Sequence, residues 1–318
     1  MNIGEIKTTT DSLCANIERA ITGKTGEIRL VLAALLAGGH VLLEDVPGTG
    51  KTMLAKALAK SISCDFGRVQ FTPDLLPSEL TGINFFSPQT GDFSFRKGSL
   101  FTNILLADEI NRATPRTQSG LLESMEELQI SVDGVTYPLP RPYFVIATQN
   151  PVETQGTFPL PEAQLDRFLI RLSLGYPAEG ESVDILRRYI AETPIDTMEA
   201  VCDTQTLAAM AEAVKAVFIH DEIYRYIVQL AQATRDHEAV SLGISTRGCI
   251  ALARLAQAWA AIDGRDFVAP DDVKALVPSV FAHRLIFRGS RRGVAPDQII
   301  GELLATVPVP VEEWQLRK

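Results

Sequence analysis

The chain has 318 residues, of which 46% are hydrophobic and 22% charged, and its formal net charge is −9. This length allows two domains with their own cores, and the acidic balance argues against broad electrostatic attraction to nucleic acid. The longest apolar stretch, residues 30–43, is interrupted by Gly38, Gly39 and His40, so we expect it to be too short to cross a membrane.

The first half of the chain alternates helical and strand-like patterns. Apolar residues recur at helical spacing before Gly26 and over residues 27–37, and a short apolar run follows at residues 41–43. Two hairpins are expected where turn residues separate apolar runs, at residues 84–96 and 129–137. Strands that alternate with helices predict a doubly wound α/β domain with a parallel sheet. Further strands are expected at residues 68–71, 103–107, 143–147 and 168–174, and helices at residues 51–61, 75–80 and 116–127.

Beyond residue 177 the pattern becomes helical. We expect a hinge at residues 177–181, so the sequence predicts an α/β domain at residues 1–177 and a smaller all-α domain at residues 178–318. Amphipathic helices are expected at residues 181–191, 204–217, 221–235, 247–262 and 271–285.

The cysteines and histidines show no paired spacing. Such scatter is typical of buried thiols in a reduced protein and differs from a zinc site or a disulfide framework. The N-terminus has acidic residues early and lacks the basic-then-apolar order of a secretion signal. We therefore expect a cytoplasmic protein without membrane insertion.

Residues 41–52 carry the most specific pattern, an apolar run followed by a turn and by Gly-Lys-Thr at a helix start. Glycines let the backbone amides point inward and the helix N-terminus adds partial positive charge, so this loop suits phosphate. Lys51 would reach the terminal phosphates, and the Thr52 hydroxyl would hold a magnesium ion. The residues expected to hold ATP are Pro47, Gly48, Thr49, Gly50, Lys51, Thr52 and Met53.

A second apolar run, residues 103–107, ends in Asp108 and Glu109. Ligands of open α/β sheets bind at the C-terminal ends of such buried strands. Asp108 is expected to support the magnesium ion and Glu109 to polarise the water that attacks the γ-phosphate. The alternative is an acidic pair that caps a helix. We disfavour it because a phosphate loop precedes this strand at a distance of one or two βαβ units.

Together these stretches resemble the MoxR-type AAA+ ATPases over nearly the whole chain. The general phosphate loop begins with glycine where this chain has Asp45, but the family shares that variation. The resemblance implies a P-loop AAA+ fold with two hairpin insertions, a smaller helical lid, and magnesium-dependent ATP hydrolysis. The matching segments are LLEDVPGTGKT, FTPDLLPSELTG, ILLADEINRATPRTQSGLLESMEE, FVIATQNP and LPEAQLDRF.

The resemblance also gives roles to three residues outside the loop. Asn150 looks like the sensor-1 residue that orients the attacking water. Arg167 looks like an arginine finger delivered to a neighbouring subunit, and Arg247 like a sensor-2 residue that reaches the phosphates from the lid as the domains close. From the residues alone, Asn150 could simply end a strand, Arg167 could pair with Asp166, and Arg247 could be a solvated side chain. Arg112 is a further candidate for a contact between subunits.

The resemblance implies a homo-oligomeric, hexameric ring that uses ATP to remodel a protein client, such as a von Willebrand factor A-domain protein or a metalloenzyme. Four aromatic residues of the first hairpin could contact that client or pack against the sheet: Phe85, Phe86, Phe93 and Phe95. Two alternatives are a scaffold that binds ATP with negligible turnover and a nucleic-acid motor or loader. In the motor, basic residues would contact phosphates, namely Arg96, Lys97, Arg141, Arg288, Arg291 and Arg292.

Overall fold

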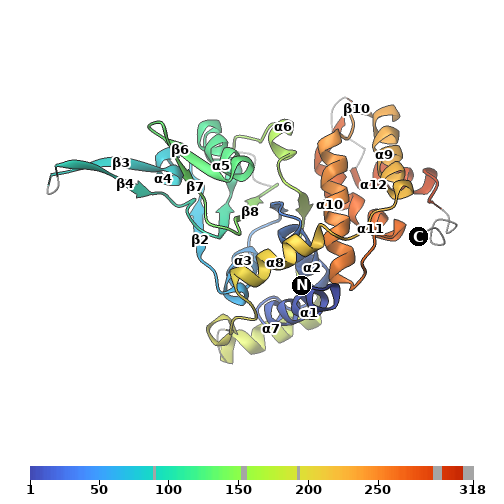
Figure 1. The fold of residues 1–318 in the computed structure, drawn as a ribbon, viewed down its shortest axis with the longest axis horizontal. Helices are drawn as coiled ribbons and strands as arrows, with labels where there is room; N and C mark the ends of the chain where they lie inside the picture. Colours follow the sequence, from blue (N-terminus) through green and yellow to red (C-terminus); the bar gives the residue numbers. More distant parts are fainter. Residues whose placement is uncertain (89–90, 152–155, 192–193, 289–295, 311–318) are drawn as a thin grey trace.

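A parallel sheet, two hairpins and a group of helices make up the molecule (Figure 1). The structure is a computed structural model that describes residues 1–88, 91–151, 156–191, 194–288 and 296–310. Within these ranges no helix is long and apolar enough to span a membrane.

The central sheet has five parallel strands in the order β2-β5-β8-β1-β9. Leu43 and Leu106 face a buried cluster that includes residues of α1 (Ile3–Glu18), α2 (Thr25–Leu36) and α3 (Lys51–Ile62). Leu42 and Leu105 face a second cluster, which includes residues of α4 (Pro77–Thr81) and α5 (Pro115–Glu127). Because both faces are covered, the strands are apolar throughout, and the predicted doubly wound α/β domain is confirmed. The strands are β1 (Val41–Glu44), β2 (Phe66–Gln70), β5 (Ile104–Asp108), β8 (Phe144–Gln149) and β9 (Ile170–Leu172).

The helices of this half begin at ordinary start signals. Asn2 and Glu5 form a reciprocal capping box at the first helix, and Pro115 occupies the first position of α5. Five of these helices lie close to their predicted ranges, namely α1 (Ile3–Glu18), α2 (Thr25–Leu36), α3 (Lys51–Ile62), α4 (Pro77–Thr81) and α5 (Pro115–Glu127). Two short helices, η1 (Ile110–Arg112) and α6 (Glu162–Leu165), were not predicted.

Both predicted hairpins are present. The first, β3 (Gly82–Ser87) with β4 (Asp92–Lys97), is inserted between β2 and β5 and projects from the body (Figure 1). The second pairs β6 (Gln129–Val132) with β7 (Val135–Pro138) through a turn in which Asp133 and Gly134 both have positive φ, as the Asp-Gly pair predicts. Stacked rings of Phe95 and Tyr137, 4.0 Å apart, join the two hairpins.

The second half of the chain is helical, as expected, with one addition. Strand β10 (Val240–Leu242) pairs antiparallel with β11 (Ile286–Phe287). This pair corrects the expectation of a domain without strands; two or three residues are too few for a period-2 pattern to be read. The helices are α7 (Glu179–Ala191), η2 (Pro194–Thr197), α8 (Thr204–Val214), α9 (Asp221–Asp236), α10 (Thr246–Ile262), α11 (Pro270–Phe281), η3 (Ala282–Arg284) and α12 (Pro296–Thr306). Helix α12 was not predicted.

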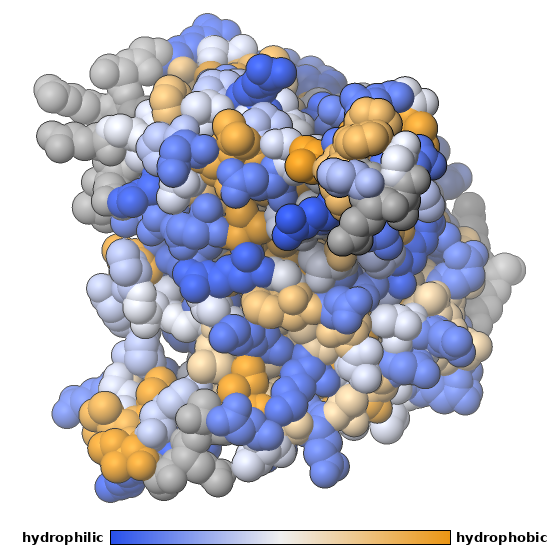
Figure 2. Space-filling model, turned by 90° about the vertical axis from the view of Figure 1, so that its left-hand side faces the viewer, coloured by the Kyte–Doolittle hydropathy of each residue, from blue (hydrophilic) through white to orange (hydrophobic). Residues whose placement is uncertain are grey.

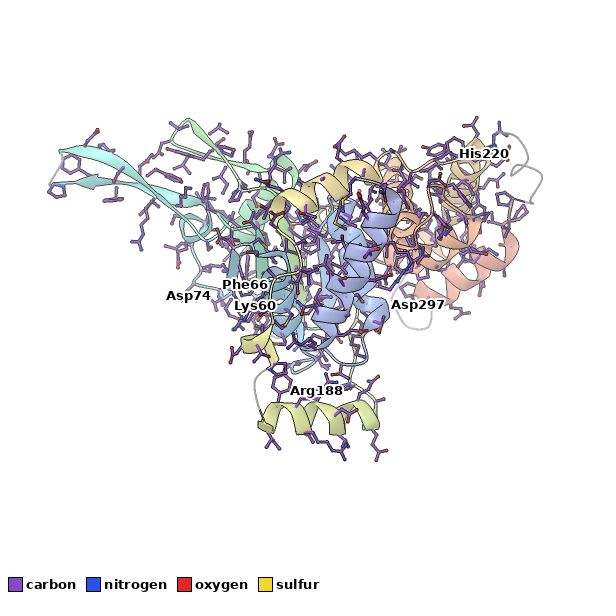
Figure 3. The ribbon with its side chains drawn as sticks, turned by 60° about the horizontal axis from the view of Figure 1, so that its bottom comes forward. Lys60, Phe66, Asp74, Arg188, His220 and Asp297 are labelled. Atoms are coloured by element: carbon purple, nitrogen blue, oxygen red, sulfur yellow. The ribbon has the colours of Figure 1, made fainter. Side chains whose placement is uncertain are left out.

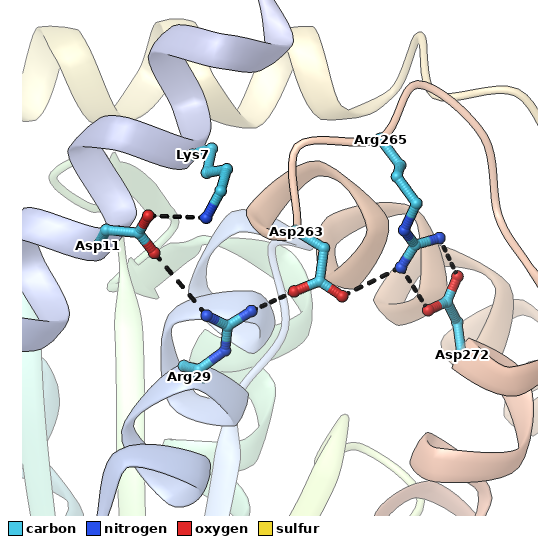
Figure 4. A network of polar contacts seen from close by, with 6 residues as sticks. All are labelled: Lys7, Asp11, Arg29, Asp263, Arg265 and Asp272. Atoms are coloured by element: carbon cyan, nitrogen blue, oxygen red, sulfur yellow. Dashed lines mark hydrogen bonds and ion pairs between the residues drawn. The ribbon is translucent and has the colours of Figure 1, made fainter.

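The two halves share one buried cluster. Helices α1 and α2 pack against α8 and α10, so apolar side chains continue from the sheet into the second half. Ion pairs follow the same junction (Figure 4), where Arg29 of α2 contacts Asp11 and Asp263. Arg265 then contacts Asp263 at 3.0 Å and Asp272 at 2.6 Å. A domain boundary at residues 177 and 178 stays a prediction.

Helix α7, which begins within the predicted hinge, lies at the edge of the molecule, where Figure 3 labels Arg188. Tyr189 of this helix donates a hydrogen bond from Oη to the carbonyl oxygen of Ala20 at 3.2 Å. Its apolar residues Val183, Leu186 and Ile190 are exposed. This helix is therefore tied to the segment before α2 rather than buried among the lid helices.

Candidate functional site

The loop between β1 and α3 has the conformation that a phosphate site requires. Gly48 and Gly50 have φ of 87° and 93°, a region that other residues rarely adopt. Gly50 directly precedes α3, whose first residue is Lys51. The Lys51 ammonium group donates to the carbonyl oxygens of Asp45 and Val46, at 2.9 and 3.0 Å. The loop, a helix N-terminus and a lysine thus converge on one spot.

Asp45 points away from this spot. Its buried carboxylate accepts hydrogen bonds from Ser173 Oγ at 3.0 Å, from the amide of Gly175 at 3.1 Å and from the amide of Leu174. A side chain at this position therefore does not fill the loop. The carboxylate instead fixes the loop to the segment that follows β9.

Asp108 ends β5 and Glu109 follows it, at the same edge of the sheet, with only β8 between their strand and β1. Thr148 of β8 orders both residues. Its hydroxyl donates to Oδ1 of Asp108 at 2.7 Å and accepts from the amide of Glu109 at 2.8 Å. Glu109 has a positive φ of 56°, a strained conformation that is frequent at functional sites.

Strand β2 holds the other side of these carboxylates. Arg68 Nη2 lies 2.7 Å from Oδ2 of Asp108, and Gln70 donates from Nε2 to Oε2 of Glu109 at 2.8 Å. Arg112 Nε also lies 3.2 Å from that oxygen. Roles for Arg68, Gln70 and Thr148 were not predicted, because their place beside β5 depends on the strand order.

Asn150 directly follows β8, so it lies at the C-terminal edge of the strand between β1 and β5. With Glu44 and Arg171 it lines a cavity of about 660 Å³. The structure therefore brings the phosphate loop, both carboxylates and Asn150 to one edge of the sheet. This is the edge at which doubly wound sheets bind ligands.

Arg167 and Arg247 lie at the opposite edge. Both form ion pairs with Glu126 at the end of α5. His40, just before β1, contacts this end of α5 through the Met125 carbonyl oxygen at 3.1 Å. Strand β1 separates His40 from the phosphate loop, and its four residues span about 13 Å at the usual rise per residue. Neither arginine therefore reaches the phosphate loop of its own chain.

The N-terminus of α10 packs near the end of α5, so Arg247 lies beside Arg167. The expected role of Arg247, which was to reach the phosphates from the lid by domain closure, stays a prediction. The alternative for Arg167, an ion pair with Asp166, is not what the structure shows, because Arg167 pairs with Glu126 and Asp166 pairs with Arg284 at 2.6 Å. Burial is the main cause that lowers the pKa of Arg284, and the carboxylate of Asp166 acts against it.

Comparisons with known proteins agree with this arrangement. Residues 40–170 match the pattern of the "ATPase family associated with various cellular activities (AAA)", and residues 232–303 match the "AAA lid domain". The chain is 37% identical to the chaperone MoxR1 of Mycobacterium tuberculosis, over 92% of this chain and 80% of that protein. The chain belongs to the MoxR family of AAA+ ATPases. Within that family it is also 31% identical to the protein MoxR of Paracoccus denitrificans, over 93% and 95% of the two chains.

Two further similarities extend over nearly the full length. The uncharacterized protein YeaC of Bacillus subtilis is 49% identical over 95% of both chains. A crystal structure from Cytophaga hutchinsonii superposes with a TM-score of 0.91 at 35% identity and covers 97% of both chains. The predicted MoxR-type AAA+ fold is therefore confirmed.

Proposed function

We propose that this MoxR-family protein is a magnesium-dependent ATPase that works as a ring and remodels a protein client. The observation that carries the proposal is the division of the site between two edges of one sheet. The phosphate loop, the carboxylates and Asn150 lie at one edge, and Arg167 and Arg247 at the other.

The first edge fits ATP and magnesium. Residues 47–53 would hold the phosphates, with Lys51 contributing positive charge, and Thr52 and Asp108 would hold the ion. Magnesium, when bound, would neutralise charge on the phosphates. Glu109 would take a proton from the attacking water and Asn150 would orient that water. The donors suit a hard cation, since they are hydroxyl and carboxylate oxygens.

The second edge supports action between subunits. An arginine that neutralises charge on the transferring phosphoryl group contributes about 10³–10⁵ in rate, but Arg167 is a strand length away from its own loop. A neighbouring copy would bring its loop to Arg167, with Arg247 beside it. A closed ring satisfies this head-to-tail contact for every subunit, and we propose six subunits, as the family resemblance implies.

The client proposal rests on the relatives and on the first hairpin. One relative is named a chaperone. In Figure 2, which looks onto the projecting hairpin, hydrophobic side chains gather at its tip. The exposed large hydrophobic residues of the whole hairpin are Ile83, Phe85, Phe86 and Phe93. Exposed aromatic groups favour contact with a protein. A von Willebrand factor A-domain protein or a metalloenzyme is the partner class that the resemblance suggests.

Nucleic acid is a weaker candidate partner. The net charge is −9, and two of the basic residues have partners within the chain. Lys97 lies over the ring of Phe101 and Arg288 donates to the carbonyl oxygen of Val240. Arg291 and Arg292 lie outside the described residues. Salt-sensitive binding to DNA with stimulation of hydrolysis would favour this alternative.

The test uses purified full-length protein and the variant Glu109→Gln. We expect wild-type protein to hydrolyse ATP only with magnesium, and with a rate per subunit that rises with protein concentration. The variant should bind ATP but lose turnover by about 10²–10⁴-fold, and in ATP it should retain a client protein. Wild-type protein without hydrolysis at any concentration, or a variant with unchanged turnover, would contradict the proposal.

A further inference from the structure

One carboxylate, that of Glu126, joins the two arginines. Its Oε2 pairs with Nη1 of Arg167 and its Oε1 with Nη2 of Arg247. Arg167 comes from the segment before β9, and Arg247 from the lid helix α10. The side chain of Glu126 therefore bridges the α/β half and the lid through a different oxygen for each.

The surroundings fix the guanidinium group of Arg167 and the start of α10 at this place. Arg167 also donates from Nη1 to the carbonyl oxygen of Leu122, one turn earlier on α5, at 3.0 Å. Ser245 caps α10 two residues before Arg247 by accepting a hydrogen bond from the amide of Gly248, and its hydroxyl donates to Oδ2 of Asp166 at 3.5 Å. Buried Arg284 holds the other oxygen of Asp166. The contacts involve residues of α5, of the segment before β9 and of the lid.

Charge makes Glu126 necessary for this arrangement. Arg167, Arg247 and Arg284 place three positive charges close together, and Asp166 offsets only part of them. Like charges at such distances repel. Without Glu126 the half-exposed Arg247 would turn to solvent, because no other carboxylate within the described residues pairs with it.

We propose that Glu126 is a positioning residue that holds Arg167 and Arg247 together as one phosphate-binding pair for the neighbouring subunit. This inference rests on the proposed ring ATPase. Each arginine contacts Glu126 through a terminal nitrogen, Nη1 in Arg167 and Nη2 in Arg247, and a guanidinium has five N–H donors. The remaining donors can bind phosphate oxygens while Glu126 keeps both side chains in place. Arg167 and Arg247 would therefore reach the phosphates of the neighbouring subunit together.

The experiment measures ATP hydrolysis by full-length Glu126→Ala. We expect kcat to fall by about 10²-fold, the usual effect of a misplaced catalytic group, with a nearly unchanged KM for ATP. Glu126→Gln keeps one acceptor oxygen, so it should retain part of the activity. The matched control is Glu123→Ala, an exposed carboxylate on the same helix, which should hydrolyse ATP like wild type. Thermal unfolding of each variant checks that the fold is retained.

Mixed rings test the action between subunits. Glu126→Ala keeps its own loop and carboxylates, whereas Glu109→Gln keeps its arginines. A mixture of the two should therefore recover hydrolysis that neither variant shows alone, as should a mixture of Arg167→Ala with Glu109→Gln.

The outcomes separate the inference from the proposed function. Full activity of Glu126→Ala alone would overturn the inference. Recovery only in the mixture with Arg167→Ala would also overturn it, because Glu126 would then act within its own subunit while the ring proposal stands. If neither mixture recovers, the arginines do not act across subunits, and both ideas fail.

Discussion

Gln70 donates a hydrogen bond from Nε2 to Oε2 of Glu109, with 2.8 Å between the two atoms. The residues end neighbouring strands, since Gln70 of β2 is in register with Asp108 of β5. Strand β2 leads on to α4 and the projecting hairpin β3–β4. One strand therefore connects the exposed insertion with the carboxylate that we propose as the general base.

Gln70→Ala is expected to raise basal ATP hydrolysis. The hydrogen bond holds the Glu109 carboxylate toward β2, and a bond to a charged group contributes about 1.5–3 kcal/mol. At this partly exposed site water replaces much of it, so we expect a rise of at most about tenfold. Steady-state phosphate release measures the change, with Gln129→Ala on the second hairpin as the control. An unchanged or lower rate would show that Gln70 does not restrain Glu109.

Asp45→Gly restores the residue that begins the general phosphate loop, yet we expect it to destabilise the protein. The carboxylate accepts from two backbone amides, of Leu174 and Gly175, and from the Ser173 hydroxyl. Their loss should cost about 2–4 kcal/mol. Urea unfolding measures the free energy, and Asp45→Asn, which keeps one acceptor oxygen, should fall between. A glycine variant as stable as wild type would rule out this role.

Local patterns predicted the strands of the parallel sheet, both hairpins and the phosphate loop, because their causes are local. Gly48 and Gly50 permit the positive φ angles of the phosphate loop, and the Asp133-Gly134 pair determines the turn of the second hairpin. The position of Asp108 at the C-terminal end of a buried strand was predicted because an apolar run ends beside it. These features need no knowledge of which strands are neighbours.

The partners of those residues could not be predicted in the same way. Thr148 and Gln70 reach the carboxylates only because β8 and β2 flank β5, and no pattern in the sequence encodes that order. The place of Arg247 depends likewise on how α10 packs near the end of α5. For the same reason Glu126, an ordinary helix surface residue by its spacing, received no role.

Asp272→Ala is expected to destabilise the junction between the N-terminal helices and the lid. Buried Asp272 pairs with Arg265 through both oxygens, at 2.6 and 2.7 Å, and caps α11 through the amide of Ala269. Removal of one partner from such a pair typically costs about 3–5 kcal/mol. Thermal or urea unfolding measures the loss. The neighbouring Asp271→Ala is the control, and equal stability of the two variants would contradict the assignment.

His40 should make the protein less stable in mild acid. Burial lowers its pKa to about 4, against which the hydrogen bond with the Met125 carbonyl acts only weakly. Nδ1 accepts from the amide of Val145 at 3.1 Å, so Nε2 donates to Met125 and the neutral ring satisfies both contacts. A proton on Nδ1 would face another N–H group. The folded state therefore resists protonation that the unfolded chain accepts below about pH 6.5.

Because the unfolded state binds the extra proton, stability is complete above pH 6.5 and falls as the pH drops from 6.5 toward 4. The slope from this residue is about 1.4 kcal/mol per pH unit, or about 3 kcal/mol in all. Urea unfolding at several pH values measures it. His40→Gln will be less stable throughout, but its stability should depend less steeply on pH in this window. Parallel curves for the two proteins would show that His40 is not the group that titrates.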